Sequence, residues 1–286
     1  MTFAWGERTY VMGILNATSD SFSGDGLLNQ ADVVAAAVAQ AQTFAAVGAD
    51  ILDIGGQSTR PGSEPVPWEV ELGRVLPVLT AVRQVTDLPI SIDTYWAKVA
   101  EAALKAGANW VNDVWGLRMD PALASLVAEA GCPIVLMHNR FRPRTSEEAV
   151  QLGDYLFPQE YVDLLPDVCR ELDVSVDLAL KKGIQPSQII LDPGIGFGKN
   201  LEQNLQLINQ LDHVKALGYP VLLGTSRKGF IGRILDLPPT ERVEGTLATV
   251  VIGIDRGADI VRVHDVAATV RAVRLTDRLV RSTGTF

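Results

Sequence analysis

Short apolar runs alternate with longer amphipathic segments from one end of the chain to the other. Apolar runs of three to five residues bounded by turn residues are typical of buried strands, whereas a 3.6-residue period indicates helices. The expected strands are Val11–Leu15, Ile51–Ile54, Ile90–Ile92, Trp110–Asn112, Ile134–Met137, Ile189–Leu191, Val221–Leu223 and Ile260–Val263. The expected helices are Asp32–Val47, Pro67–Val85, Trp96–Ala106, Pro121–Ala130, Pro158–Lys182, Leu201–Leu217, Glu241–Arg256 and Val266–Leu279.

The order of these elements predicts an α/β protein with a parallel sheet. Several strands follow a small-residue turn such as Gly48-Ala49-Asp50 or Gly107-Ala108-Asn109, as expected where a helix ends and a strand begins. Eight such units in 286 residues fit a (β/α)8 TIM barrel. A doubly wound sheet would need a glycine fingerprint after the first strand, but Asn16-Ala17-Thr18-Ser19-Asp20 follows it. We therefore expect one barrel domain over residues 1–286, without a second domain.

The longest interruptions follow the first, second and fifth strands. They are Asn16–Leu28, Gly55–Pro67 and Asn139–Phe157. In a barrel of this type the loops after the strands form the active face. The sequence thus predicts long βα loops around a site at the carboxyl ends of the strands.

Polar side chains lie at or just beyond the carboxyl end of every expected strand. They are Asn16, Thr59, Arg60, Asp93, Asn112, Asp113, His138, Asp192, Arg227, Lys228, Arg262 and His264. Individually they have structural explanations: Asp93 and Asn112 could cap helices, Asp192 could belong to a turn, and Arg262 could pair with Asp259 or Asp265. Their recurrence on one side of the sheet favours a single polar site in the barrel mouth.

The chemistry of this set has two parts. Carboxylates and an amide at Asp93, Asn112 and Asp192 suit a flat heterocycle with N–H donors and carbonyl acceptors. Cations at positions such as Lys228 and Arg262 suit phosphate or pyrophosphate. The net charge of −9 and pI of about 4.9 argue against nucleic acid or an anionic membrane as partner, so any anion site must be local.

Three other site classes are not supported. Asp192-Pro193-Gly194-Ile195-Gly196-Phe197-Gly198-Lys199-Asn200 resembles a phosphate-binding loop, but Pro193 replaces its first Gly and Asn200 its Ser or Thr. The three histidines lie far apart, without metal-ligand spacing. Ser226 lacks the neighbours of a hydrolase triad. The two cysteines form no framework, and neither a leader nor a membrane-spanning run is evident, so we expect a cytoplasmic protein.

Eight ordered motifs resemble the dihydropteroate synthase family, a group of pterin-binding TIM barrels. They are the segments 12–23 (MGILNATSDSFS), 53–62 (DIGGQSTRPG), 91–94 (SIDT), 111–114 (VNDV), 136–138 (LMH), 192–199 (DPGIGFGK), 226–228 (SRK) and 262–266 (RVHDV). The resemblance extends from about Tyr10 to Val266. It implies condensation of (7,8-dihydropterin-6-yl)methyl diphosphate with 4-aminobenzoate to 7,8-dihydropteroate and pyrophosphate.

The resemblance also implies roles for individual residues. Asp93, Asn112, Asp192 and Lys228 would bind the pterin, and Thr59, Arg262 and His264 the diphosphate. Asn16 would be the protein ligand of Mg2+, with the diphosphate as co-ligand. Arg60, Phe197 and the turn after Lys228 would border the aminobenzoate, and the catalytic group would comprise Asp93, Lys228, Arg262 and His264. The resemblance also implies a homodimer. Because the sequence shows no pyrophosphokinase domain, we expect a monofunctional chain.

The chain departs from the family pattern at several positions. Ser19, Gln57 and Gly229 replace the usual Pro, Glu and Ser, and the segments 24–26 and 139–144 also differ from the usual sequence. The family Ser at position 229 lies by the aminobenzoate carboxylate. Two alternatives remain open: a pterin-binding barrel of the methyltransferase type, which holds no diphosphate, and a non-catalytic pterin-binding paralogue.

Overall fold

Eight parallel strands form the central sheet of the computed structural model, which describes residues 3–17, 33–57, 66–140 and 160–281. The strands are β1 (Tyr10–Asn16), β2 (Ile51–Gly55), β3 (Ile90–Asp93), β4 (Trp110–Asp113), β5 (Ile134–Met137), β6 (Ile189–Asp192), β7 (Leu222–Leu223) and β8 (Ile260–Val263). They are hydrogen-bonded in the order β6-β5-β4-β3-β2-β1-β8-β7. A parallel bridge between Leu191 and Val221 joins β6 to β7 and closes the circle. The predicted (β/α)8 barrel is confirmed, with every predicted strand in place.

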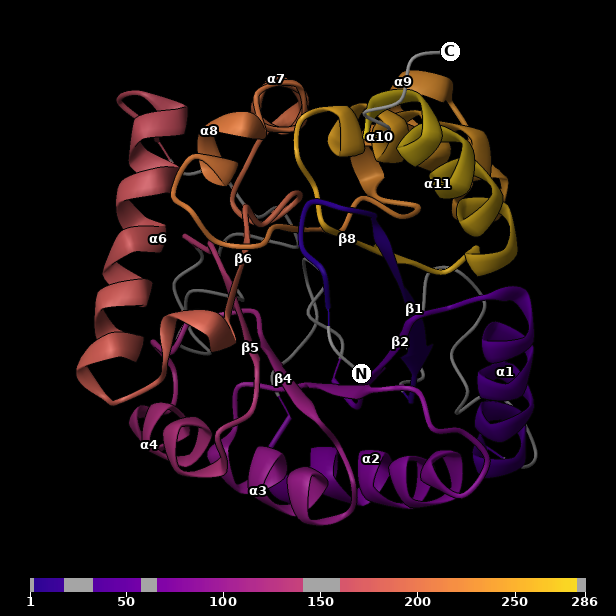
Figure 1. Cartoon of the computed structure of the whole chain (residues 1–286), viewed down its shortest axis with the longest axis vertical. Coiled ribbons are helices and arrows are strands. Elements are labelled where there is room, and N and C mark those ends of the chain that lie inside the picture. The colour runs from indigo at the N-terminus through magenta and orange to yellow at the C-terminus, as the bar shows by residue number, and fades with distance from the viewer. Residues whose placement is uncertain (1–2, 18–32, 58–65, 141–159, 282–286) are drawn as a thin grey trace, which may run out of the picture.

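Helices surround this sheet on the outside (Figure 1). The α-helices are α1 (Val33–Val47), α2 (Trp68–Arg83), α3 (Ala97–Lys105), α4 (Pro121–Ala130), α6 (Leu164–Lys181), α7 (Leu201–Asn209), α8 (Asp212–Lys215), α9 (Gly229–Leu235), α10 (Val243–Asp255) and α11 (Val266–Val280). Short 3-10 turns span Pro186–Gln188 and Pro239–Glu241. The bounds follow local signals. In α4, Asp120 accepts from Ala122 N–H, Pro121 occupies the first turn, and Gly131 ends the helix at φ 64°.

Two helix predictions differ from the structure, and one helix was not predicted. The predicted helix Leu201–Leu217 is two helices, α7 and α8, because Gln210 leaves the helical region at φ −121°, ψ 35°. The predicted helix Pro158–Lys182 begins only at Leu164, after Asp163 in an extended conformation. The short helix α9 was not among the predicted helices. Its seven residues directly follow Lys228.

The barrel interior changes from apolar to polar along the strands. Alternate residues of a strand face the same side, so Ile51 and Asp53 share a face, as do Ile260 and Arg262. The lower layer is an apolar cluster: Tyr10, Met12, Ile51, Trp110, Val135, Ile190, Leu222 and Ile260. The residues two positions further along β2, β4, β6 and β8 are Asp53, Asn112, Asp192 and Arg262. The apolar layer thus forms a floor beneath a polar mouth.

Aromatic side chains extend this floor at the amino end of the barrel. Phe3 and Trp5 stack with ring centroids 5.1 Å apart, and both also contact Tyr10 and Trp110 edge-on. This packing fixes the N-terminal segment across the end opposite the polar residues. Among the helices of the described ranges, none combines the length and low charge that a bilayer span requires.

Candidate active site

Arg262 on β8 is the centre of the polar mouth. Its Nε lies 2.6 Å from Asp53 Oδ2, and its Nη2 lies 2.8 Å from Asp93 Oδ2. Asn112 Nδ2 also donates to Asp53 Oδ2, at 3.3 Å. One guanidinium therefore binds two buried carboxylates on neighbouring strands, so Arg262 lies inside the barrel. The expectation that it could pair with Asp259 or Asp265 on the surface is wrong.

Asp93 is the most perturbed carboxyl group of this cluster. Burial raises the pKa of Asp93 to about 7, the Arg262 guanidinium opposes that rise, and the nearby carboxylates of Asp53, Glu71 and Asp113 add to it. Desolvation of the buried carboxyl group is the main reason for the direction of the shift, and the second acid that shares the guanidinium, Asp53, adds to it. Asp93 can thus change protonation near neutral pH and can face a group that gains positive charge.

Asp192 and Lys228 form the opposite side of the mouth. Asp192 Oδ1 accepts from Gly194 N–H at 2.7 Å, and Lys228 Nζ donates to the Ile195 carbonyl and lies 5.0 Å from the Phe197 ring centroid. Burial lowers the pKa of Lys228 to about 8, against the opposing field of Asp192. The loop after β6 therefore places Asp192, Phe197 and Lys228 around the same space.

Two hydrogen-bonded contacts connect the turns after β7 and β8. Ser226 Oγ accepts from His264 N–H at 3.1 Å and lies 3.0 Å from His264 Nδ1. Arg227, at φ 56°, pairs with Asp265 through Nε at 2.9 Å and Nη2 at 2.6 Å. These contacts fix the residues that follow Arg227 and precede Asp265, which are Lys228 and His264. A cation and an imidazole are thereby held beside Arg262.

Asn16 ends β1 beside Gly55 at the same rim of the barrel. Among the described residues no group of three or more His, Cys, Asp or Glu side chains could hold a metal ion. A single amide oxygen suits Mg2+ when phosphate oxygens supply other ligands, so the donor set fits a metal bound together with a diphosphate. Thr59 and Arg60, two predicted binding residues, lie outside the described residues.

The helix-cap explanation of the strand-end residues fails in the structure. Helix α3 is capped at Trp96, and the side chain that accepts from Ala97 N–H is Asp120, not Asp93. Asn112 donates to Asp53 instead of capping a helix. Asp53 itself was missed as a site residue, although an acid in the fully buried strand β2, two residues after Ile51, is a signal that could have found it.

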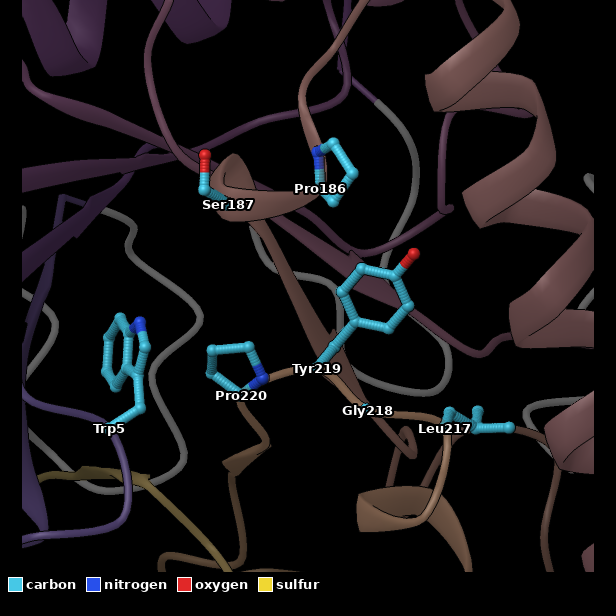
Figure 2. Close-up of a pocket in the computed structure, with 7 residues that line it drawn as sticks. All are labelled: Trp5, Pro186, Ser187, Leu217, Gly218, Tyr219 and Pro220. Atoms are coloured by element: carbon cyan, nitrogen blue, oxygen red, sulfur yellow. The ribbon is translucent and has the colours of Figure 1, made fainter.

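A surface depression lies at the other end of the barrel (Figure 2). Its volume is about 450 Å3, and its lining comes from the segments before β6 and β7 together with Trp5. Figure 2 shows Tyr219 and Pro186 facing one another across it, with no charged side chain among the residues drawn. The charged groups of the polar mouth lie at the carboxyl ends of the strands, so the chemistry of the mouth is the stronger indication of the active site.

Comparisons with known proteins agree with this geometry. A model of the family described as pterin binding enzyme matches residues 12–264. A dihydropteroate synthase of Clostridium beijerinckii is 49% identical over 280 residues, which cover 98% of this chain and 97% of the relative. A structure of the Clostridium difficile enzyme obtained with pteroic acid is 45% identical, with a TM-score of 0.88 over 98% of this chain and 100% of that one. A Xanthomonas albilineans enzyme solved with 4-aminobenzoic acid is 42% identical, with a TM-score of 0.85 over 96% and 94%.

Proposed function

The chain belongs to the dihydropteroate synthase family of pterin-binding transferases, and we propose that its barrel mouth joins (7,8-dihydropterin-6-yl)methyl diphosphate to 4-aminobenzoate. One observation carries the assignment to this mouth: Arg262 and Lys228 lie beside Asp93, Asn112 and Asp192 at the carboxyl ends of the strands. Cations for a diphosphate and acceptors for a heterocycle thus occur in one place. The products are 7,8-dihydropteroate, pyrophosphate and a proton.

Each side chain has a role that follows from its charge and place. The carboxylates of Asp93 and Asp192 accept from the N–H groups of the pterin edge, the Asn112 amide can both donate and accept there, and Lys228 lies beside it. Arg262 and His264, with Thr59, hold the diphosphate and stabilise the negative charge that grows on it as the C–O bond breaks. Asp93 faces the positive charge that develops on the pterin methylene. The aminobenzoate nitrogen then attacks from the side of Arg60 and Phe197, without a covalent enzyme intermediate.

Asn16 is the residue that we propose as the protein ligand of Mg2+. When bound with the diphosphate, the metal supplies charge neutralisation at the leaving group. The chain's own contribution is the amide oxygen of Asn16 at the rim, beside the carboxyl end of β2.

Pyrophosphate release is the measurement that tests this function. The purified chain is expected to release pyrophosphate from the pterin diphosphate only when both 4-aminobenzoate and Mg2+ are present. A methyltransferase-type barrel would bind pterin but release no pyrophosphate, and a non-catalytic paralogue would bind both substrates without turnover. Absence of the dependence on 4-aminobenzoate would contradict the proposal.

Gly229 is the position at which we expect substrate affinity to differ from the family pattern. A Cβ built at Gly229 meets no atom within 4 Å, and the residue begins α9 without an unusual φ. Gly229→Ser should therefore fold normally and provide a hydroxyl donor near the aminobenzoate carboxylate. We expect the KM for 4-aminobenzoate to fall about threefold to tenfold, the value of one net hydrogen bond. Gly73→Ser serves as the control, since Gly73 is exposed on α2 and a Cβ there also meets no atom within 4 Å. An unchanged KM in Gly229→Ser would contradict the expectation.

We also propose a homodimer, supported by exposed apolar side chains on α10 and α11. Leu275 and Leu279 are 64% and 63% exposed one turn apart on α11, and Val251 and Ile252 of the adjacent α10 are 38% and 41% exposed. Leu275→Lys should shift sedimentation velocity profiles toward the monomer, because a buried charge opposes association. Val174→Lys on α6, where Val174 is 59% exposed, is the matched control. An equal effect of both variants, or none, would contradict an interface at α11.

One observation each supports the proposed single domain and the proposed cytoplasmic location. All eight strands form one sheet, which supports our proposal that residues 1–286 act as a single domain. Cys132 and Cys169 are free thiols, which supports the proposed cytoplasmic location.

A further inference from the structure

The Lys199 side chain is enclosed by the loop that follows β6. The residue is 8% exposed, and its Nζ lies 2.9 Å from each of three acceptors: Gly194 O, Phe197 O and His138 Nδ1. An ammonium group has three donors, so these contacts use all of them. The lysine of the segment that resembles a phosphate-binding loop therefore binds the backbone of its own loop, not a phosphate.

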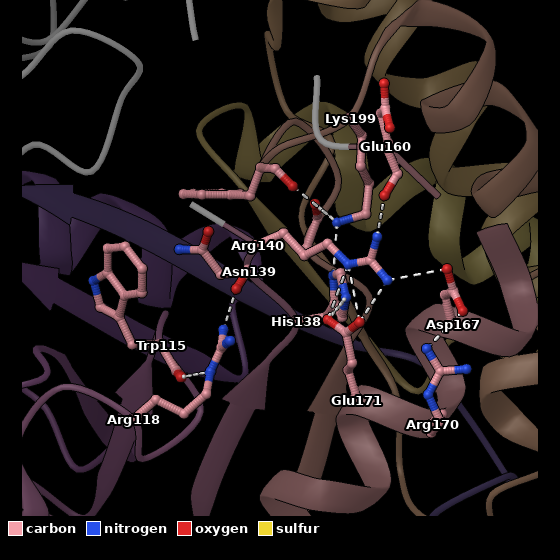
Figure 3. A network of polar contacts seen from close by, with 12 residues as sticks. Trp115, Arg118, His138, Asn139, Arg140, Glu160, Asp167, Arg170, Glu171 and Lys199 are labelled. Atoms are coloured by element: carbon pink, nitrogen blue, oxygen red, sulfur yellow. Dashed lines mark hydrogen bonds and ion pairs between the residues drawn. The ribbon is translucent and has the colours of Figure 1, made fainter. Parts of the chain in front are cut away.

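His138 continues this contact toward α6 (Figure 3). Its Nε2 lies 3.1 Å from Glu171 Oε2, and Arg140 Nη2 lies 2.5 Å from Glu171 Oε1. Glu171 needs a donor and Lys199 needs an acceptor, which fixes the tautomer: Nε2 carries the hydrogen and Nδ1 accepts. Burial lowers the pKa of His138 to about 4, with Lys199 acting in the same direction, so the imidazole is neutral. A series of hydrogen bonds from Glu171 on α6 through His138 to Lys199 thus holds the loop that follows β6.

The loop held in this way carries much of the proposed pterin site. Gly194 N–H donates to Asp192, the Ile195 carbonyl accepts from Lys228, and the Phe197 ring lies beside Lys228. The loop also packs directly on the fifth strand's end, because a Cβ on Gly194 would lie 1.9 Å from His138 O. A change in the position of this backbone would move contacts to both Asp192 and Lys228.

We propose that Lys199, held by His138 and Glu171, is a positioning residue that fixes the Gly194–Phe197 backbone as one wall of the pterin site. The inference rests on the proposed function, since it concerns the same mouth. Lys199 does not touch the diphosphate side of the mouth, where Arg262 and His264 lie. Its effect should therefore fall on pterin binding and not on pyrophosphate binding.

Burial of the charged Lys199 side chain has a cost in stability. Burial lowers the pKa of Lys199 to about 7, from 10.5, so near neutral pH the unfolded chain binds this proton more tightly than the fold does. Lys199→Met removes this cost, but it also leaves three buried acceptors, Gly194 O, Phe197 O and His138 Nδ1, without their donor, so we expect Tm to fall. A purely structural residue would lower Tm without a selective rise in the KM for the pterin diphosphate.

The test is Lys199→Met in the full chain, with Lys181→Met as the matched control at an exposed lysine of α6. We expect the KM for the pterin diphosphate to rise about tenfold or more, as for the loss of at least one net hydrogen bond. The Kd for pyrophosphate with Mg2+ should stay within about twofold of wild type, while Tm should fall because three buried acceptors lose their donor. Lys181→Met should change none of the three.

Variants of His138 test the same series of hydrogen bonds independently of Lys199. His138→Asn keeps an acceptor near the Nδ1 position and should preserve pterin binding better than His138→Leu. The effects of His138→Leu and Lys199→Met should be less than additive, because both remove the same contact. An unchanged pterin KM in Lys199→Met, a parallel loss of pyrophosphate binding, or full additivity would overturn the role of Lys199. A wild-type chain that binds no pterin diphosphate would overturn the proposed function as well.

Discussion

Asp93→Asn is expected to lower kcat by about 10²- to 10³-fold while it changes the Kd for pyrophosphate with Mg2+ only a few-fold. The amide keeps the size and most of the hydrogen bonding of the carboxyl group, but it carries no negative charge toward the developing cation. Pyrophosphate contacts Arg262 and His264 instead, and Arg262 keeps its 2.6 Å contact with Asp53 in the variant. Steady-state kinetics and calorimetric titration with pyrophosphate measure the two quantities separately.

The fold of this variant should be intact, which makes the kinetic result interpretable. The pKa of Asp93 is about 7 in the fold, above its ordinary value of 3.8. A raised pKa contributes stability that is present below about pH 4 and lost as pH rises through 7, so at pH 8 the ionised carboxylate stabilises least. Asp93→Asn should therefore cost less stability at pH 8 than at pH 5. Equal losses in kcat and in pyrophosphate affinity would contradict the role assigned to Asp93.

Arg262→Met is expected to lower the free energy of unfolding by about 3–5 kcal/mol near pH 8, because it leaves two buried carboxylates without their shared cation. Asp53 has no exposed surface and Asp93 is 9% exposed, so water can solvate neither group well. Urea unfolding followed by circular dichroism measures the change. Turnover should be lost together with stability, because Arg262 also binds the leaving diphosphate in the proposed mechanism.

The size of this loss should depend on pH and on burial. In wild type the guanidinium opposes the rise in the Asp93 pKa, so its removal extends protonation to higher pH and makes the ionised form costlier. The difference between wild type and Arg262→Met should shrink as pH falls from 8 to 5. Arg256→Met is the control: Arg256 pairs with Asp255 at 2.6 Å, but both are about 40% exposed, and the cost should stay below about 1 kcal/mol. Similar losses in the two variants would contradict the argument from burial.

The fold was predicted from local patterns, in which the residues of one segment are sufficient to identify a helix, a strand or a turn. Alternation of apolar runs and amphipathic segments predicted eight strands, and the small-residue turns placed their starts. The prediction was wrong at Gln210, where no Gly or Pro marks the break between α7 and α8. Helix α9 was missed because its seven residues are too short for a clear period.

The residue pattern predicted the candidate site as a set of strand ends, and the family resemblance added roles for individual residues. Asp93, Asn112, Asp192, Lys228 and Arg262 meet in one mouth, as expected for the carboxyl ends of a barrel. Two connecting residues were missed. Asp53 accepts hydrogen bonds from Arg262 and Asn112, and the Lys199 ammonium group is buried within its own loop, where it donates to the Gly194 carbonyl. Both act through contacts between segments far apart in the sequence, which no local pattern contains.

The sequence by itself determined the element order, the barrel and the family, because hydrophobic period, turn residues and motif letters are properties of contiguous segments. The tertiary structure alone decided which charges meet. Arg262 could have faced solvent beside Asp265, yet the two-residue alternation of β8 above an apolar floor turns it inward onto Asp53 and Asp93. Because β1 pairs with both β2 and β8, barrel closure brings Arg262 to Asp53, 209 residues away in the sequence. Burial in this mouth then raises the pKa of Asp93.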